Sequence, residues 1–158
     1  MGHGQQLSRF LPDEQAVARL AQCLATDLSA PWVFYLRGDL GAGKTTFARA
    51  FIHALGYPGR VKSPSYGLLE TYCAGGLQVL HLDLYRIEDV AEIEYLGLRD
   101  LFAEQSILMV EWPEKGGGYL PLPDLELHFS EHESGRLVEI RSFSSAGQGR
   151  LSALNPEQ

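Results

Sequence analysis

Cysteine is scarce in this sequence: only Cys23 and Cys73 occur among its 158 residues, and neither belongs to a C-x-x-C pair. We interpret both as small apolar residues of a protein in a reducing compartment, with a disulfide between them as the less favoured alternative. Long apolar runs are missing as well, since no stretch approaches the roughly 20 residues that span a bilayer. Residues 1–6 lack the charged start and apolar stretch of a signal peptide. These absences predict a cytoplasmic protein with no membrane partner.

Basic residues are few compared with acidic ones. The chain has 13 Lys and Arg against 20 Asp and Glu, which gives a formal net charge of −7. Proteins that bind RNA or DNA by themselves carry a basic face, because the neutralisation of backbone phosphates by Lys and Arg supplies much of the affinity. Tight independent binding of nucleic acid is therefore not expected, although composition does not test for a local basic patch. The composition is otherwise typical of a globular protein, and the length predicts one domain over residues 1–158.

Residues 38–46 carry the strongest signal in the sequence. They read Gly-Asp-Leu-Gly-Ala-Gly-Lys-Thr-Thr and match the pattern G-x-x-x-x-G-K-[ST] of a phosphate-binding loop. In such a loop glycines let backbone N–H groups point at phosphate oxygens, the lysine reaches the β- and γ-phosphates, and the hydroxyl after it binds Mg²⁺. An apolar stretch at 32–36 precedes the loop as a buried strand would. The candidate ATP-binding residues here are Gly41, Ala42, Gly43, Lys44, Thr45 and Thr46.

Two acids at strand ends are candidates for the metal and the water of such a site. Asp83 follows the apolar residues 79–82, and Glu111 follows residues 107–110. Open α/β sheets bind ligands at the carboxyl ends of their strands, so at least one of these acids is expected in the site. Which one contacts the metal directly stays open. His81 would lie on the same strand face as Asp83, and we interpret it as a core histidine, with orientation of Asp83 as the alternative.

The regular elements expected from the apolar pattern alternate between strands and helices. Strands are predicted at residues 7–11, 32–37, 68–73, 77–83, 106–111, 125–130 and 137–143. Helices are predicted after Asp13, from Lys44 with Phe47, Phe51, Ala54 and Leu55 buried, near residues 88–93 with Val90 and Ile93 inward, and at residues 100–102. Residues 57–67 form either a γ-phosphate-sensing segment or a plain surface loop, and the weakly patterned tail 144–158 is expected to be mobile.

This element order predicts an α/β fold of the P-loop NTPase kind: a three-layer sandwich with a mixed central sheet, parallel core strands, antiparallel hairpins and helices on the faces. A GTPase is disfavoured, because Asp83 is followed by Leu84, Tyr85 and Arg86 instead of D-x-x-G, and no N-K-x-D occurs. A small-molecule kinase is the closer rival, although the paired arginines of a kinase lid are missing. A slow ATPase switch that serves a larger complex is the third reading.

Four ordered segments together resemble the TsaE (YjeE) family of bacterial ATPases. They are residues 38–46, Val61-Lys62-Ser63-Pro64-Ser65-Tyr66, His81-Leu82-Asp83-Leu84-Tyr85-Arg86 and Glu111-Trp112-Pro113-Glu114-Lys115. The resemblance implies a subunit that binds Mg²⁺ and ATP, releases ADP, and works docked on the TsaB–TsaD complex. That complex makes N6-threonylcarbamoyladenosine beside the tRNA anticodon, so contact with tRNA would be indirect.

The resemblance also implies individual roles. Lys44 would hold the phosphates, Thr45 and Glu111 would bind Mg²⁺, and Asp83 would position or activate water or support the metal through a water. Lys44, Asp83 and Glu111 are thus the implied catalytic residues. The implied switch and partner residues are Ser63, Pro64, Ser65 and Trp112, with serine at 65 where the family usually has threonine. The residues implied at the adenosine end are Glu14, Gly135 and Arg136.

Overall fold

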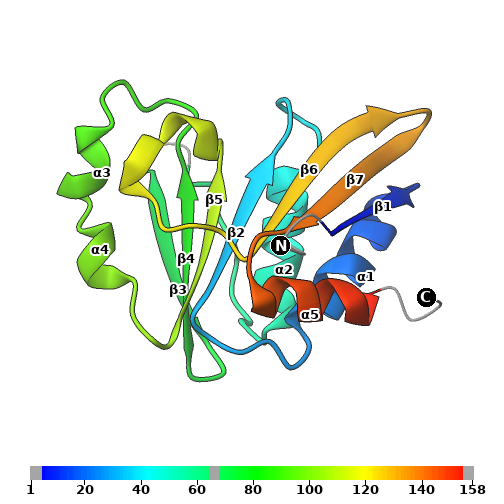
Figure 1. Cartoon of the computed structure of the whole chain (residues 1–158), viewed down its shortest axis with the longest axis horizontal. Coiled ribbons are helices and arrows are strands. Elements are labelled where there is room, and N and C mark those ends of the chain that lie inside the picture. Colours follow the sequence, from blue (N-terminus) through cyan, green and yellow to red (C-terminus); the bar gives the residue numbers. More distant parts are fainter. Residues whose placement is uncertain (1–4, 65–67, 155–158) are drawn as a thin grey trace.

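A mixed sheet forms the centre of the molecule (Figure 1). The computed structural model describes residues 5–64 and 68–154, and within them the sheet has seven strands in the order β1-β7-β6-β2-β5-β4-β3. The strands are β1 (Gln6–Leu11), β2 (Trp32–Arg37), β3 (Leu69–Ala74), β4 (Leu77–Asp83), β5 (Ser106–Glu111), β6 (Leu125–His132) and β7 (Gly135–Ser142). The four central strands β6, β2, β5 and β4 are parallel, whereas β1, β7 and β3 pair antiparallel with their neighbours.

Helices cover both faces of this sheet. The helical elements are α1 (Glu14–Ala25), α2 (Lys44–Ala54), α3 (Ala91–Tyr95), α4 (Leu98–Leu101), α5 (Ser145–Leu154) and the 3₁₀ turns η1 (Pro113–Lys115) and η2 (Gly117–Tyr119). α1, α2 and α5 pack on one face, called here the α2 face, where Phe34 contacts the rings of Phe47 and Phe51. α3 and α4 pack on the opposite face around Ile93 and Leu98. The predicted three-layer α/β architecture is therefore confirmed.

Local sequence features account for the two helices nearest the loop. Asp13 caps α1, since its carboxylate accepts a hydrogen bond from Ala16 N at 2.9 Å. Apolar residues at helical spacing then turn one side of α1 toward the core: Val17, Leu20, Ala21 and Leu24. α2 starts at Lys44 directly after the predicted phosphate loop, which places the loop between the end of β2 and a helix N-terminus (Figure 1).

Three local expectations need correction. In α2, Ala54 is exposed, and Ala48 and Ile52 complete the buried side. The short helix α3 starts at Ala91, later than predicted, and Val90 before it is 37% exposed while Ile93 is buried. The tail prediction is wrong for residues 145–154, because they form α5 and bury Leu151 and Leu154 against the core. Across residues 5–64 and 68–154, none of the helices is long and apolar enough to cross a membrane.

Candidate nucleotide-binding site

The loop between β2 and α2 adopts a backbone that requires glycine. Gly38, Gly41 and Gly43 have φ values of +139°, +78° and +121°, which L side chains rarely adopt. Gly38 also lies against β6, where an added Cβ would stand 2.5 Å from the carbonyl oxygen of Phe129. The first glycine of the sequence pattern therefore serves close packing as well as backbone curvature.

Lys44 extends into the loop instead of into solvent. Its side chain is 4% exposed, and Nζ donates hydrogen bonds to the carbonyl oxygens of Gly38 and, at 2.9 Å, Asp39. Desolvation by burial lowers the pKa of Lys44, and the nearby carboxylates of Glu111 and Asp83 oppose that shift. The ammonium is thus held at the loop by carbonyl oxygens and surrounding negative charge.

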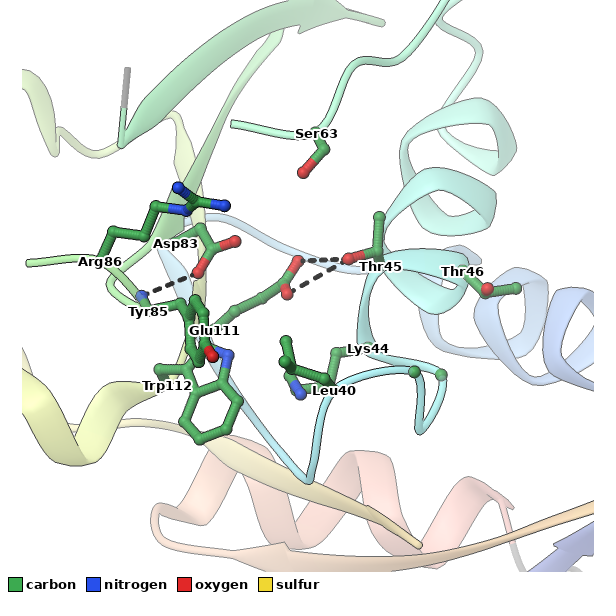
Figure 2. Close-up of a pocket in the computed structure, with 12 residues that line it drawn as sticks. Leu40, Lys44, Thr45, Thr46, Ser63, Asp83, Tyr85, Arg86, Glu111 and Trp112 are labelled. Atoms are coloured by element: carbon green, nitrogen blue, oxygen red, sulfur yellow. Dashed lines mark hydrogen bonds between the residues drawn. The ribbon is translucent and has the colours of Figure 1, made fainter. Parts of the chain in front are cut away.

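Glu111 is a buried carboxylate at the carboxyl end of β5. It is 2% exposed, and both of its oxygens accept from Thr45 Oγ1 at 3.3 Å (Figure 2). A shorter hydrogen bond of 2.7 Å joins its Oε2 to His81 Nε2. His81 therefore contacts Glu111, and the alternative in which it orients Asp83 has no hydrogen bond to support it among the described residues.

Asp83 ends β4 directly opposite Glu111 on the neighbouring parallel strand. Its Oδ1 accepts a hydrogen bond from Tyr85 N at 3.0 Å. Desolvation by burial raises the pKa of Asp83, partly offset by this backbone hydrogen bond, and the carboxylate of Glu111 raises it further. Two close acids, one of them with a raised pKa, are typical of sites that hold a cation or handle a proton.

The indole of Trp112 packs against the ammonium of Lys44. Its indole lies over Lys44 Nζ, 4.5 Å from the ammonium to the ring centroid, and it contacts the ring of Tyr85 at 5.0 Å. Trp112 has φ of +60°, a conformation that is strained for a non-glycine residue. The sequence prediction that this residue lies beside the loop is consistent with its position.

These side chains line one open cavity of about 300 Å³ (Figure 2). Lys44, Thr45, Asp83 and Glu111 all contribute to its wall, and so does Ser63 from the loop after α2. Pro64 is buried and is not among the lining residues, while Ser65 lies outside the described part of the chain. Leu40, Tyr85 and Arg86 also line the cavity, although no role was predicted for them. Tyr85 and Arg86 could have been suspected, because they belong to the segment that starts at His81.

A second cavity of about 220 Å³ adjoins the opposite side of the loop. Glu14, Gly135 and Arg136 line it together with Gly41, Gly43 and Thr46 of the loop. Arg136 donates to the carbonyl oxygen of Gly41 at 2.9 Å, which ties the last hairpin to the loop. The residues expected at the adenosine end thus gather in one place, from α1 and β7, and their role toward a nucleotide stays a prediction.

The donor set suits Mg²⁺ in the presence of a nucleotide. No group of three or more His, Cys, Asp or Glu residues that could hold a metal occurs in the described ranges 5–64 and 68–154. Mg²⁺ is usually held by one or two carboxylates and a hydroxyl, completed by phosphate oxygens and water. Glu111 and Thr45, with Asp83 opposite, match that description.

The family relationship follows from comparison with known proteins. The family model described as threonylcarbamoyl adenosine biosynthesis protein TsaE matches residues 11–138. A Haemophilus influenzae protein named tRNA threonylcarbamoyladenosine biosynthesis protein TsaE is 37% identical over 156 residues, covering 96% of this chain and 99% of that protein. The Bacillus subtilis protein of the same name is 39% identical over 117 residues, covering 73% of this chain and 71% of that protein.

A solved structure shows the same fold. The crystal structure of Bacillus subtilis YdiB superposes with a TM-score of 0.80 and 24% sequence identity, covering 99% of both chains. The likeness shows that the two chains share one fold over nearly their whole length.

Proposed function

This chain belongs to the TsaE family of tRNA threonylcarbamoyladenosine biosynthesis proteins, and from that premise we propose its biochemical role. It is a Mg²⁺-dependent ATP-binding subunit that hydrolyses ATP slowly, releases ADP, and acts on a TsaB–TsaD complex in the cytoplasm. The complex, and not this subunit, carries out the modification of tRNA. The acidic net charge of −7 supports this division of labour, because it leaves the tRNA-binding surface to the partners.

The observation that carries the proposal is the meeting of four side chains at one cavity. Lys44 and Thr45 start α2, whereas Asp83 and Glu111 end two adjacent parallel strands, and all four line the same space. A loop of positive-φ glycines alone would fit any bound anion. A loop combined with two strand-end carboxylates fits an anion that arrives with a divalent cation, which is the composition of Mg-ATP.

Each residue has a role that follows from its place. Lys44 would exchange its contacts with the loop carbonyl oxygens for the phosphates of the nucleotide. Thr45 and Glu111 would hold Mg²⁺, which when bound neutralises charge on the phosphate oxygens. Asp83 opposite Glu111 would accept a hydrogen bond from the attacking water, and its raised pKa suits it to take up a proton. Ser63, at the cavity wall, would sense the terminal phosphate.

Partner binding would use the part of the cavity rim that changes with the nucleotide. Trp112 lies over Lys44, so a shift of the ammonium toward bound phosphates would change its cation–π contact with the indole. Ser63 and Pro64 belong to the loop after α2, and Ser63 lines the cavity. We propose that these residues report the state of the nucleotide to the TsaB–TsaD complex.

Reconstitution tests the proposal. The complete mixture contains the TsaB–TsaD complex, tRNA, ATP, threonine, bicarbonate and threonylcarbamoyl-adenylate synthase, with this protein added or omitted. Addition should stimulate modification and turnover of ATP, and Lys44→Ala should abolish both because the phosphates lose their cation. The matched control is Arg19→Ala, which removes an exposed cation on α1 and should behave as wild type. Unchanged modification without this protein, or transfer of labelled γ-phosphate to a metabolite, would contradict the proposal.

A further inference from the structure

His81 is a buried polar residue to which the proposed mechanism assigns no role. It is 0% exposed on β4, the strand next to the edge strand β3, and pairs in register with Met109 of β5. Glu111 stands two residues further along β5 on the same face, so the two side chains are diagonal neighbours. Their contact of 2.7 Å is the shortest hydrogen bond made by Glu111 among the described residues.

The two oxygens of Glu111 are made unequal by this contact. Oε2 accepts from both His81 and Thr45, while Oε1 accepts only the longer hydrogen bond of 3.3 Å from Thr45. A carboxylate without the imidazole could rotate about its last torsion, since that torsion has broad, low barriers. The imidazole fixes the plane of the carboxylate and leaves Oε1 for the cavity.

The imidazole itself has one partner. Nδ1 of His81 is buried and has no hydrogen-bond partner within the described residues. A buried N–H without an acceptor is costly, whereas the carboxylate at Nε2 requires a donor there. The arrangement therefore favours the tautomer that carries its hydrogen on Nε2, with a bare Nδ1 facing the core.

From this geometry we propose that His81 is a positioning residue: it orients the Glu111 carboxylate so that Oε1 is presented to the divalent cation that accompanies the nucleotide. The inference rests on the proposed function, because the cation enters with ATP. Hydrogen-bond partners that orient a metal-binding side chain in this way typically change metal affinity by about 10- to 100-fold when removed. Among the described residues, no hydrogen bond joins the His81 side chain to the loop, so nucleotide binding without metal should not depend on it.

The test compares two substitutions by calorimetric titration of nucleotide at a series of Mg²⁺ concentrations. His81→Leu removes the donor and should raise the Mg²⁺ concentration needed for ATP binding by about 10-fold, with unchanged affinity for Mg-free ADP. His81→Gln restores an N–H at the reach of Nε2 and should return most of the lost affinity. Val79→Ala is the control for general loosening of the strand, because Val79 is buried on the same face of β4 and pairs with Ile107, four residues before Glu111 on β5.

Several outcomes would overturn the inference. They are a wild-type Mg²⁺ dependence in His81→Leu, equal losses for ATP and Mg-free ADP, or the same change in Val79→Ala. Wild-type protein that binds ATP without any Mg²⁺ dependence would instead overturn the proposed metal site itself. If His81→Leu does not fold, the ¹⁵N chemical shifts of the wild-type imidazole decide. Hydrogen on Nε2 supports the proposal and hydrogen on Nδ1 contradicts it.

Discussion

Gly38→Ala probes the packing of the phosphate loop against the sheet. Gly38 has φ of +139°, and a Cβ placed there would stand 2.5 Å from Phe129 O and 3.3 Å from Ala42 Cβ. The nearest atom belongs to the backbone of β6, which is paired on both sides, by β2 and by β7. The clash therefore cannot be relieved by rotation of a side chain.

The expected cost has two parts. Holding a non-glycine residue in such a backbone conformation costs about 1–3 kcal/mol, and forcing an extra carbon into a packed region costs about 1–3 kcal/mol more. A total near the middle of that range, about 4 kcal/mol, lowers the melting temperature of a chain of this size by roughly 8–16 °C. This is a large part of the roughly 5–15 kcal/mol that stabilises a typical domain.

Gly41→Ala is the matched control in the same loop. Gly41 also has positive φ, +78°, but an added Cβ meets no atom within 4 Å. Only the left-handed conformation is then penalised, at about 1–2 kcal/mol. Urea unfolding followed by circular dichroism measures both variants. Gly38→Ala within about 1 kcal/mol of wild type, or equal losses for the two variants, would refute the close approach of the loop to β6.

Three further predictions concern other parts of the molecule. Asp83→Asn should abolish most ATP turnover yet raise the free energy of unfolding at pH 7. Because the pKa of Asp83 is higher in the folded than in the unfolded protein, wild-type stability falls as the pH rises from below the unfolded pKa to above the folded pKa. Asparagine does not ionise and so removes that fall. Thermal melts at pH 4 and 7 should show the gain mainly at pH 7, and an equal gain at both would count against it. In α5, Gly147→Ala should destabilise by about 1–3 kcal/mol, since its Cβ would stand 2.1 Å from Asp124 O. Gly149→Ala, with no atom within 4 Å, should stabilise by about 0.5–1 kcal/mol, and the opposite order in melting temperature would contradict the docking of α5. ATP should change the tryptophan emission through Trp112, which lies over Lys44, and Trp112→Phe should remove that change; a surviving signal would point to Trp32.

Patterns that are local in the sequence predicted most of the fold. The loop at 38–46, the strand before it and the cap at Asp13 depend on neighbouring residues, and all three are found where expected. The two strand-end acids could be foreseen for the same reason, because parallel strands place their carboxyl ends together. Asp83 and Glu111 are indeed direct partners in the register of β4 and β5.

Features that depend on contacts between distant segments could not be foreseen. The hydrogen bond between His81 and Glu111 depends on the register of β4 against β5, and sequence proximity alone suggested Asp83 as the partner. The helix α5 has little apolar periodicity, and it is held by Leu151 and Leu154 together with the close approach of Gly147 to Asp124. Such docking depends on the surface that the rest of the chain offers.

Separate titrations with Mg-ATP and with Mg-free ADP distinguish a cation-binding Glu111 from a structural one. Glu111 is buried, bonded to Thr45 and opposite Asp83, so its loss should remove the cation without disturbing the phosphate loop. We expect that wild-type protein binds both ligands and that Glu111→Ala loses much of its affinity for Mg-ATP while keeping wild-type affinity for Mg-free ADP. Equal losses for the two ligands would make Glu111 a structural residue and contradict the proposed Mg-ATP site.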